Sequence, residues 1–292
     1  MIIDSHAHYT HKLYDGEFDY LDYRSGEFSV SRADRRGMLE AMAQGGIALC
    51  IEPSTSLEKI EGQIAFVKAH APYMRLALGV HPKNCTLSSW EDREKLRGFV
   101  LDNQVVAIGE TGLDYSLGPD EAEKQRQKDW FCYQIDLAHE RQLPLILHIR
   151  DADREALEIL RFRRDRLCGG VAHCFHGDAQ TAMAFAELGF TLGIGGKLLG
   201  QDAEGENLRE TVKRVPLSTI LVETDAPYIK PDISHLRDSR KQRSKVRNSS
   251  LILPAVIDTI ARLRGEDRNR VEETIYTNTL RVFRLKEGGE TG

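Results

Sequence analysis

The sequence opens on a histidine pair, His6-Ala7-His8, which follows a short apolar segment. Side chains alternate across a strand, so residues two apart project to the same side. Both imidazoles can therefore meet one cation. A bare His-x-His pair is a weak signal, and its meaning depends on which other residues fall at equivalent positions.

Four further candidate metal ligands follow the ends of other short apolar segments. Imidazole and carboxylate groups are the ligands that suit first-row divalent metals. Separate buried histidines, each hydrogen bonded to the backbone, would not be expected to share such positions. The predicted metal ligands are His6, His8, Glu110, His148, His173 and Asp225.

This set of residues suits hydrolysis. One cation can lower the pKa of a bound water from ~15.7 to near 7, and two cations about 3.5–4 Å apart can clamp attacking and leaving oxygens. Glu110 is the candidate carboxylate between two metals, and Asp225 is the candidate base for the attacking water. Asp4 and Glu223 lie two residues before ligands and are candidates for hydrogen bonds that orient them.

Eight short apolar segments are the expected strands that position these residues: 2–4, 47–52, 75–80, 105–109, 144–147, 170–172, 190–193 and 219–222. Helical patterns lie between them, most clearly over 121–142, and Ser249 or Ser250 is expected to cap a helix that ends near Gly265. Strands alternating with helices indicate parallel units. Eight such units closing on themselves form a TIM (β/α)8 barrel. A doubly wound sheet is the alternative, but no glycine fingerprint follows the first strand.

The bulk properties fit one enzyme domain. The 292 residues match one barrel of about 250 residues, so we predict a single domain over 1–292. A net charge of −5 argues against a protein that coats nucleic acid, but not against a local phosphate site. Five scattered cysteines indicate reduced thiols, and no signal peptide or span of ~20 apolar residues is visible. We expect a soluble cytoplasmic protein without a membrane or an obligate protein partner.

Two segments depart from the regular alternation. Residues 9–32 are rich in aromatic and acidic side chains, and residues 237–247 contain six basic residues and one acid. Both are expected at the end of the barrel that carries active sites. The aromatic side chains could stack on bases at ~1–3 kcal/mol each, as part of a lid. A solvated surface excursion is the alternative.

The segments around the predicted ligands resemble the TatD family of metal-dependent deoxyribonucleases, within the amidohydrolase superfamily. The similarity runs nearly end to end and is most specific in Gly109-Glu110-Thr111-Gly112-Leu113-Asp114 and in Glu223-Thr224-Asp225-Ala226-Pro227. It also covers residues 3–8, 79–82, 143–152, 172–177 and 278–283. One departure follows the eighth strand, where the family usually has Arg-Asn-Glu-Pro and this chain has Arg247-Asn248-Ser249-Ser250.

The resemblance implies a TIM barrel with two divalent cations on the six ligands, and phosphodiester hydrolysis, often as a 3′→5′ exonuclease. It does not distinguish Mg²⁺, Mn²⁺ and Zn²⁺. By the same resemblance His81 would contact the scissile phosphate. Arg150 is a further phosphate-binding candidate, because a guanidinium matches phosphate oxygens, and so is Arg247 in the basic segment. DNA or another phosphodiester is the expected substrate.

Three functional hypotheses follow. The first is a nuclease in which a metal-activated hydroxide attacks phosphorus in line and Asp225 acts as base. The second keeps the nucleophile and changes the bond to an amide, a lactone or an aminoacyl-tRNA ester. Many binuclear amidohydrolases have a carboxylated lysine at the position of Glu110. The glutamate in this chain favours phosphodiester hydrolysis over the second hypothesis. The third is a barrel that binds without catalysis, which the presence of all six ligands opposes.

Overall fold

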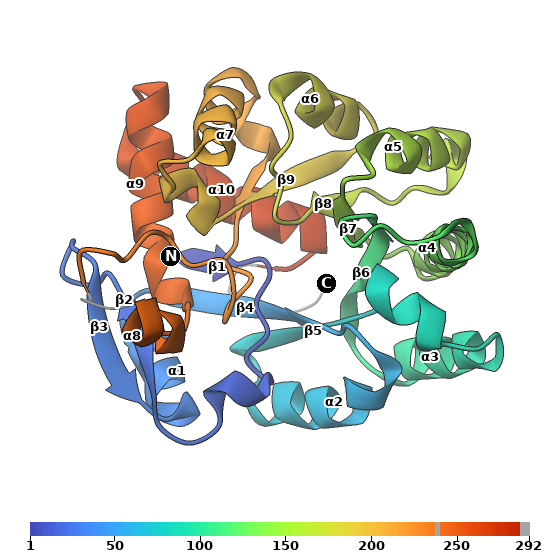
Figure 1. Ribbon diagram of the computed structural model, residues 1–292, viewed down its shortest axis with the longest axis horizontal. Helices are drawn as coiled ribbons and strands as arrows, with labels where there is room; N and C mark the ends of the chain where they lie inside the picture. The colour runs from blue at the N-terminus through green and yellow to red at the C-terminus, as the bar shows by residue number, and fades with distance from the viewer. Residues whose placement is uncertain (237–239, 287–292) are drawn as a thin grey trace. The chain divides into compact units, whose positions relative to one another are not determined.

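The computed structural model describes residues 1–236 and 240–286. Within these residues, eight strands form one sheet in chain order (Figure 1). The strands are β1 (Ile2–Asp4), β4 (Ile47–Pro53), β5 (Met74–Leu78), β6 (Val105–Asp114), β7 (Leu145–Arg150), β8 (Gly170–Ala172), β9 (Phe190–Ile194) and β10 (Ile220–Val222). Each predicted strand begins within one residue of an observed one, so the expected positions of the strands are confirmed.

Helices alternate with these strands, as a (β/α)8 fold requires. They are α1 (Arg35–Gln44), α2 (Ile60–Ala69), α3 (Glu91–Asp102), α4 (Glu121–Arg141), α5 (Asp153–Phe162), α6 (Ala179–Glu187), α7 (Ala203–Arg214), α8 (Arg240–Lys245), α9 (Leu253–Arg264) and α10 (Arg268–Phe283). The helix predicted over 121–142 is α4. The helix expected before Gly265 is α9, and Gly265 ends it in the left-handed conformation. No helix in the described part of the chain is long and apolar enough to cross a membrane.

The chain divides into two compact units. The first unit contains residues 1–51, 174–182 and 193–279, and the second contains residues 52–173, 183–192 and those from 280 onward. Strands β4 and β9 contribute residues to both units. The prediction of a single domain over 1–292 stays a prediction.

In the first unit, the segments that follow β1 and β10 are paired. Ser5 N–H donates to the carbonyl of Val222 at 3.1 Å, and Ala7 and Ala226 form a parallel bridge. Pairing of the first and last strands is the feature that closes a sheet into a barrel. Helix α9 packs against both strands and buries Val256 and Ile260. The fold class predicted from the sequence, an α/β TIM barrel, is confirmed.

The aromatic segment 9–32 forms the 3₁₀ turn η1 (Lys12–Tyr14) and an antiparallel hairpin of β2 (Phe18–Asp22) and β3 (Ser29–Ala33) (Figure 1). Leu21 N–H donates to the carbonyl of Arg247, and Arg247 N–H donates to the carbonyl of Asp19, so the segment after α8 extends this hairpin. Four of the aromatic side chains are buried: Tyr9, Tyr14, Phe18 and Tyr20. The prediction that these four side chains stack on bases is therefore wrong, because they form core. Tyr23 and Phe28 are only partly buried, so base stacking by these two stays a prediction. Of the predicted basic segment, residues 237–239 lie outside the described residues.

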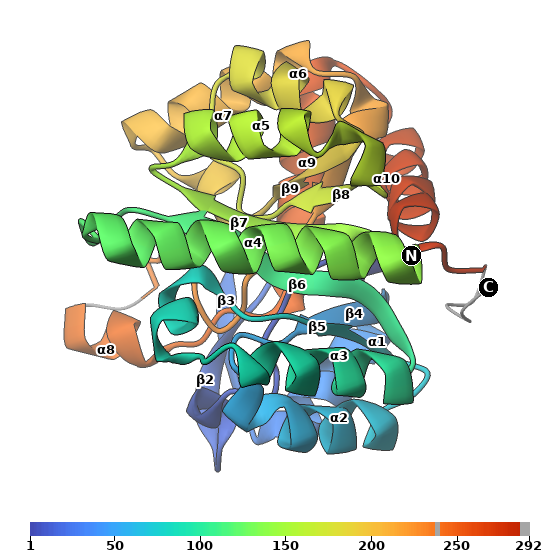
Figure 2. The ribbon, with the colours of Figure 1, turned by 90° about the vertical axis from the view of Figure 1, so that its right-hand side faces the viewer.

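In the second unit, α4 packs against β6 (Figure 2). It begins with a capping box between Asp120 and Glu123. Strand β6 was expected to end before Glu110, but its pairing with β7 continues to Asp114. The register shifts between Ile108 and Thr111, so Glu110 lies at a bulge inside the strand. Bulges re-aim side chains next to active sites.

Candidate metal centre

Three predicted ligands of the first unit converge, and we call them the first cluster: His6, His8 and Asp225. The Nε2 atoms of His6 and His8 lie 3.2 Å apart. Asp225 Oδ1 lies 3.3 Å from His8 Nε2 and 3.7 Å from His6 Nε2. Two imidazoles and a carboxylate with ligand atoms this close form a suitable donor set for a divalent cation.

The backbone of the first cluster is fixed by Asp4. Its carboxylate accepts the N–H groups of His6 and Thr224, each at 3.1 Å. It also accepts the hydroxyls of Thr224 and Ser250, each at 2.6 Å. Tyr9 Oη lies 2.6 Å from Ser250 Oγ and extends the network. Burial raises the pKa of Asp4 to about 7, although the bonds from Ser250 and Thr224 act in the opposite direction.

Glu223 supports the chain next to another predicted ligand. Its carboxylate accepts the N–H of Cys174, the residue that follows His173. The side chain lies against Gly193, where an added Cβ atom would collide with the Glu223 carboxylate. Only glycine leaves room for this carboxylate. Asp4 and Glu223, both predicted to orient ligands, thus bond to main-chain groups beside them.

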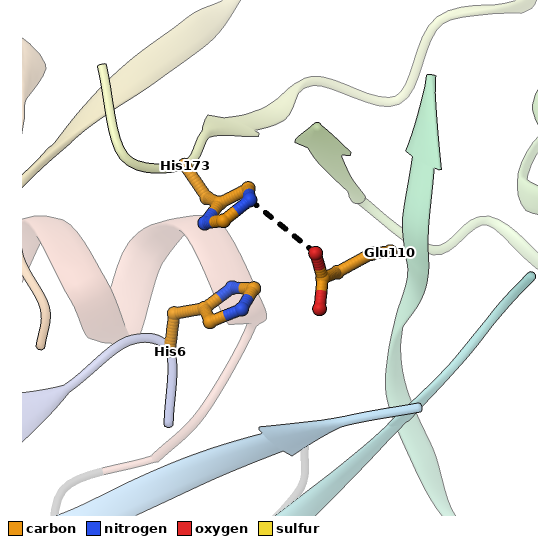
Figure 3. A group of neighbouring side chains, drawn as sticks. All are labelled: His6, Glu110 and His173. Atoms are coloured by element: carbon orange, nitrogen blue, oxygen red, sulfur yellow. Dashed lines mark ion pairs between the residues drawn. The ribbon is translucent and has the colours of Figure 1, made fainter. Parts of the chain in front are cut away.

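The other three predicted ligands converge in the second unit, and we call them the second cluster: Glu110, His148 and His173. His148 Nδ1 lies 3.0 Å from His173 Nε2. Glu110 Oε2 lies 3.3 Å from His173 Nε2 and 3.5 Å from His148 Nδ1. Figure 3 shows the pairing of Glu110 with His173. Glu110 is almost fully buried, so its carboxylate faces these imidazoles instead of bulk water.

The imidazole of His148 is oriented by Asp114, a residue that the sequence reasoning did not assign to the site. His148 Nε2 lies 3.0 Å from Asp114 Oδ2, so Nε2 carries the proton and Nδ1 presents its lone pair to the second cluster. A carboxylate behind a ligating histidine is a recurrent device of metal sites. Asp114 follows Glu110 by four residues in β6, and the family segment 109–114, which contains it, was the signal that could have found it.

Asp114 is itself held by Ser116 and Lys83. Ser116 Oγ and N–H donate to Asp114 Oδ1 at 2.6 and 3.0 Å, and Lys83 Nζ lies 3.1 Å from Oδ2. Burial alone would raise the pKa of Asp114, but the bonds from His148, Ser116 and Lys83 hold it well below its usual range. Asp114 is therefore a fixed negative charge behind His148.

Comparison with known proteins identifies the family. Residues 3–284 match the family described as TatD related DNase. The chain belongs to this family. The 3′-5′ ssDNA/RNA exonuclease TatD of Cronobacter sakazakii is 35% identical over 250 residues, which cover 86% of this chain and 92% of the relative. The uncharacterized metal-dependent hydrolase YcfH of Escherichia coli K12 is 33% identical over 284 residues, which cover 97% of this chain and 96% of that protein.

Solved structures agree with this assignment. The crystal structure of YjjV, a TatD homologue from Escherichia coli K12, superimposes with a TM-score of 0.79 at 27% identity and covers 98% of each chain. A TatD-family hydrolase from Entamoeba histolytica, 21% identical with a TM-score of 0.76, shares the fold over 96% of this chain and 97% of its own. The protein is therefore a metal-dependent hydrolase of the TatD family.

His81, the family's candidate for contact with the scissile phosphate, lies beside the second cluster. Its Nδ1 accepts the N–H of Lys83 at 3.1 Å, so the proton resides on Nε2, which lies 3.8 Å from Glu110 Oε2. Burial, together with the adjacent His148, lowers the pKa of His81 to about 3. In a TatD-family site, His81 is thus a neutral hydrogen-bond donor.

The two arginine candidates for phosphate binding differ in their surroundings. Arg150 ends β7 with an exposed side chain, and no described residue accepts a hydrogen bond from its guanidinium. Arg247 donates from Nε to the carbonyl of Leu13 at 3.2 Å and from Nη1 to the carbonyl of Ser244 at 3.4 Å. Arg247 therefore links η1 to α8 in the first unit. Phosphate binding by either residue stays a prediction.

Proposed function

We propose that this TatD-family hydrolase is a deoxyribonuclease-type enzyme that removes nucleotides from the 3′ end of single strands with two divalent cations. The observation that carries the proposal is the convergence of His148 Nδ1, His173 Nε2 and Glu110 Oε2 within 3.5 Å. The proposed preference for single strands and the 3′→5′ direction follow the name of the Cronobacter relative, a 3′-5′ ssDNA/RNA exonuclease. The scattered cysteines make the cytoplasm the proposed compartment.

The first and the second cluster are each a proposed ligand set for one divalent cation. When bound, the cations would supply Lewis acidity that favours deprotonation of a water molecule and neutralises the phosphate charge. Asp225 accepts the proton of the attacking water at its carboxylate, which lies 3.3 Å from His8 Nε2. Asp114 keeps the proton of His148 on Nε2, so that the Nδ1 lone pair stays available.

Neutral and positively charged hydrogen-bond donors would bind the phosphates of the substrate. His81 donates its Nε2 proton to a phosphate oxygen without adding a charge. Arg150, exposed at the end of β7, binds a neighbouring phosphate through its planar guanidinium. Arg247 is a weaker candidate for the same role, because two of its nitrogens already donate to carbonyl oxygens.

The test is a cleavage assay on 5′-labelled single-stranded DNA with Mg²⁺ or Mn²⁺, run beside an identically prepared Asp225→Asn variant. We expect a ladder that shortens from the 3′ end, and a rate lower by about 10²–10⁴-fold in the variant, as for loss of a general base. Metal content is measured for both proteins. Equal rates with equal metal would contradict the role of Asp225. No cleavage by metal-loaded wild type would overturn the proposal and turn attention to amides, lactones and aminoacyl esters.

A further inference from the structure

Trp90 has an exposed indole nine residues after His81 in the chain. It lies in the second unit between the 3₁₀ helix η3 (Pro82–Leu87) and α3, and its side chain is 71% exposed. The other tryptophan, Trp130, is only 3% exposed. An indole in water leaves a large apolar surface hydrated, and tryptophan is enriched at binding interfaces.

The indole is backed by an arginine on one face. The guanidinium carbon of Arg93 lies 3.6 Å from the centroid of the Trp90 ring. Arg93 is almost fully buried, with Trp130 and Tyr133 each 5.3 Å from its guanidinium carbon. No described residue accepts a hydrogen bond from Arg93 Nε, and the guanidinium is stacked among these aromatic rings. The cation–π contact fixes the plane of the indole and leaves the opposite face to solvent.

The loop that carries Trp90 starts at the candidate phosphate site. His81 caps η3, and six residues of 3₁₀ helix rise by about 12 Å, which is roughly three to four nucleotides of a stacked strand. Helix η3 packs against β6 and α4. Leu87 and Leu117 are also exposed, and Leu117 lies three residues beyond Asp114 on the loop after β6. Exposed apolar groups thus occur on the segment that follows His81 and on the loop that follows Asp114.

We propose that Trp90, backed by Arg93, is a stacking platform for an unpaired base of the strand whose phosphate lies at His81. A net charge of −5 gives the protein little general attraction for a polyanion, so its affinity for a strand has to come from local contacts. Aromatic rings stack on any base and are a common device for single strands. Paired bases of a duplex are stacked within their own helix, so the platform selects single strands. This inference rests on the proposed function.

The test measures binding apart from cleavage. An end-labelled single strand is titrated with the Asp225→Asn protein in Mg²⁺, and its fluorescence anisotropy gives the affinity. Adding Trp90→Ala should weaken binding roughly 5- to 150-fold, the range expected for one stacked base. The matched control is Phe162→Ala, which removes an aromatic ring that is 88% exposed at the end of α5. It should leave the affinity unchanged.

Three further comparisons separate stacking from a structural effect. Trp90→Phe keeps a ring and should recover most of the affinity, whereas Trp90→Leu keeps apolar surface only and should not. A strand of abasic nucleotides should bind the Asp225→Asn parent more weakly than the intact strand does, and Trp90→Ala should not weaken its binding further. Unchanged thermal unfolding of Trp90→Ala confirms that the variant is folded.

The outcomes distinguish this inference from the proposed function. If wild type gives no ladder but Trp90→Ala still weakens strand binding, the cleavage proposal fails and the platform stands. If wild type gives the ladder and Trp90→Ala binds like Phe162→Ala, the platform is wrong and the cleavage proposal stands. Equal affinity of Trp90→Leu and the parent would also overturn stacking, because it would leave only apolar contact.

Discussion

The first and second clusters have the same donor chemistry but different supports. His6 and Asp225 follow strands on segments whose backbone is fixed by a buried carboxylate, Asp4, with hydroxyl and N–H partners. In the second cluster, the side chain of His148 is fixed directly by Asp114. Asp114 in turn pairs with Lys83, whose side chain is 42% exposed. Asp4 is therefore buried among uncharged donors, whereas Asp114 pairs with a charged side chain that reaches solvent.

We expect this difference to separate the stability of the fold from the affinity for metal. Buried donors left without an acceptor cost about 1–3 kcal/mol each, so the Asp4 network should govern the stability of the fold. A carboxylate behind a ligating imidazole changes ligand basicity and orientation, so Asp114 should govern metal affinity. Substitutions in the two supports are therefore expected to give different readouts.

The largest effect is expected from Asp4→Ala. The change removes the acceptor of the His6 N–H and of the hydroxyls of Thr224 and Ser250, while the Thr224 N–H keeps a longer bond to the carbonyl of His6. It should lower the free energy of unfolding by about 3 kcal/mol or more. Urea unfolding of the metal-free protein measures it. Asp165→Asn, an exposed acid on the 3₁₀ turn η4 (Arg164–Arg166), is the control and should change little. A loss no greater than that of the control would contradict the structural role of Asp4.

Asp114→Asn should instead weaken metal binding about 10- to 100-fold, as is typical for loss of an outer carboxylate. The amide can still accept the His148 Nε2 proton, but without the negative charge that raises imidazole basicity. Calorimetric titration of the metal-free protein with Mn²⁺ gives the affinity, again beside Asp165→Asn. Unfolding should change less than in Asp4→Ala. If Asp114→Asn lowered the free energy of unfolding by more than it lowered the free energy of Mn²⁺ binding, the assignment of metal affinity to Asp114 and of stability to Asp4 would be wrong.

Ser250→Ala is expected to cost about 1–2 kcal/mol of stability. Ser250 Oγ links Tyr9 to Asp4, and its removal leaves one acceptor site of the carboxylate unused. Ser244→Ala, in which an exposed hydroxyl donates to a carbonyl of α8, is the matched control. Chemical unfolding of both variants tests whether the network stabilises the fold, and metal affinity should stay near that of the parent. A Ser250 variant as stable as the Ser244 variant would show that Ser250 does not stabilise the fold through Asp4.

The sequence predicted much of this centre because its signals are local. Strand alternation and the strand ends indicated His6, His8 and the other candidate ligands, and the family segments agreed. Asp114 was missed because β6 was expected to stop before Glu110, and a bulge that lets a strand continue has no simple local pattern. The Ser250–Asp4 bond joins residues 246 positions apart, and such a pairing is set by barrel closure.

The hairpin of β2 and β3 shows the same limit. Its aromatic content suggested a binding surface, but one face of the hairpin packs into a core that residues distant in the sequence complete. Leu21 packs there with Ile233, Val246 and Ile252. By contrast, the contact between Trp90 and Arg93 joins residues only three positions apart, but the sequence analysis did not single them out.

The smallest effect, and the one with the opposite sign, is expected from Lys83→Met. Lys83 lies 3.1 Å from Asp114 Oδ2 and places a positive charge beside the second cluster. Its removal makes the local charge more negative, so Mn²⁺ affinity should rise, by less than about fivefold because an exposed pair contributes at most ~1 kcal/mol. The gain should shrink as salt is added, since mobile ions screen exposed charges. Lys95→Met, which removes an exposed ammonium paired with Asp92 on α3, is the control. A fall in Mn²⁺ affinity would mean that Lys83 acts by holding Asp114 in position. Asp114 would then resemble Asp4, whose partners fix the geometry of the site.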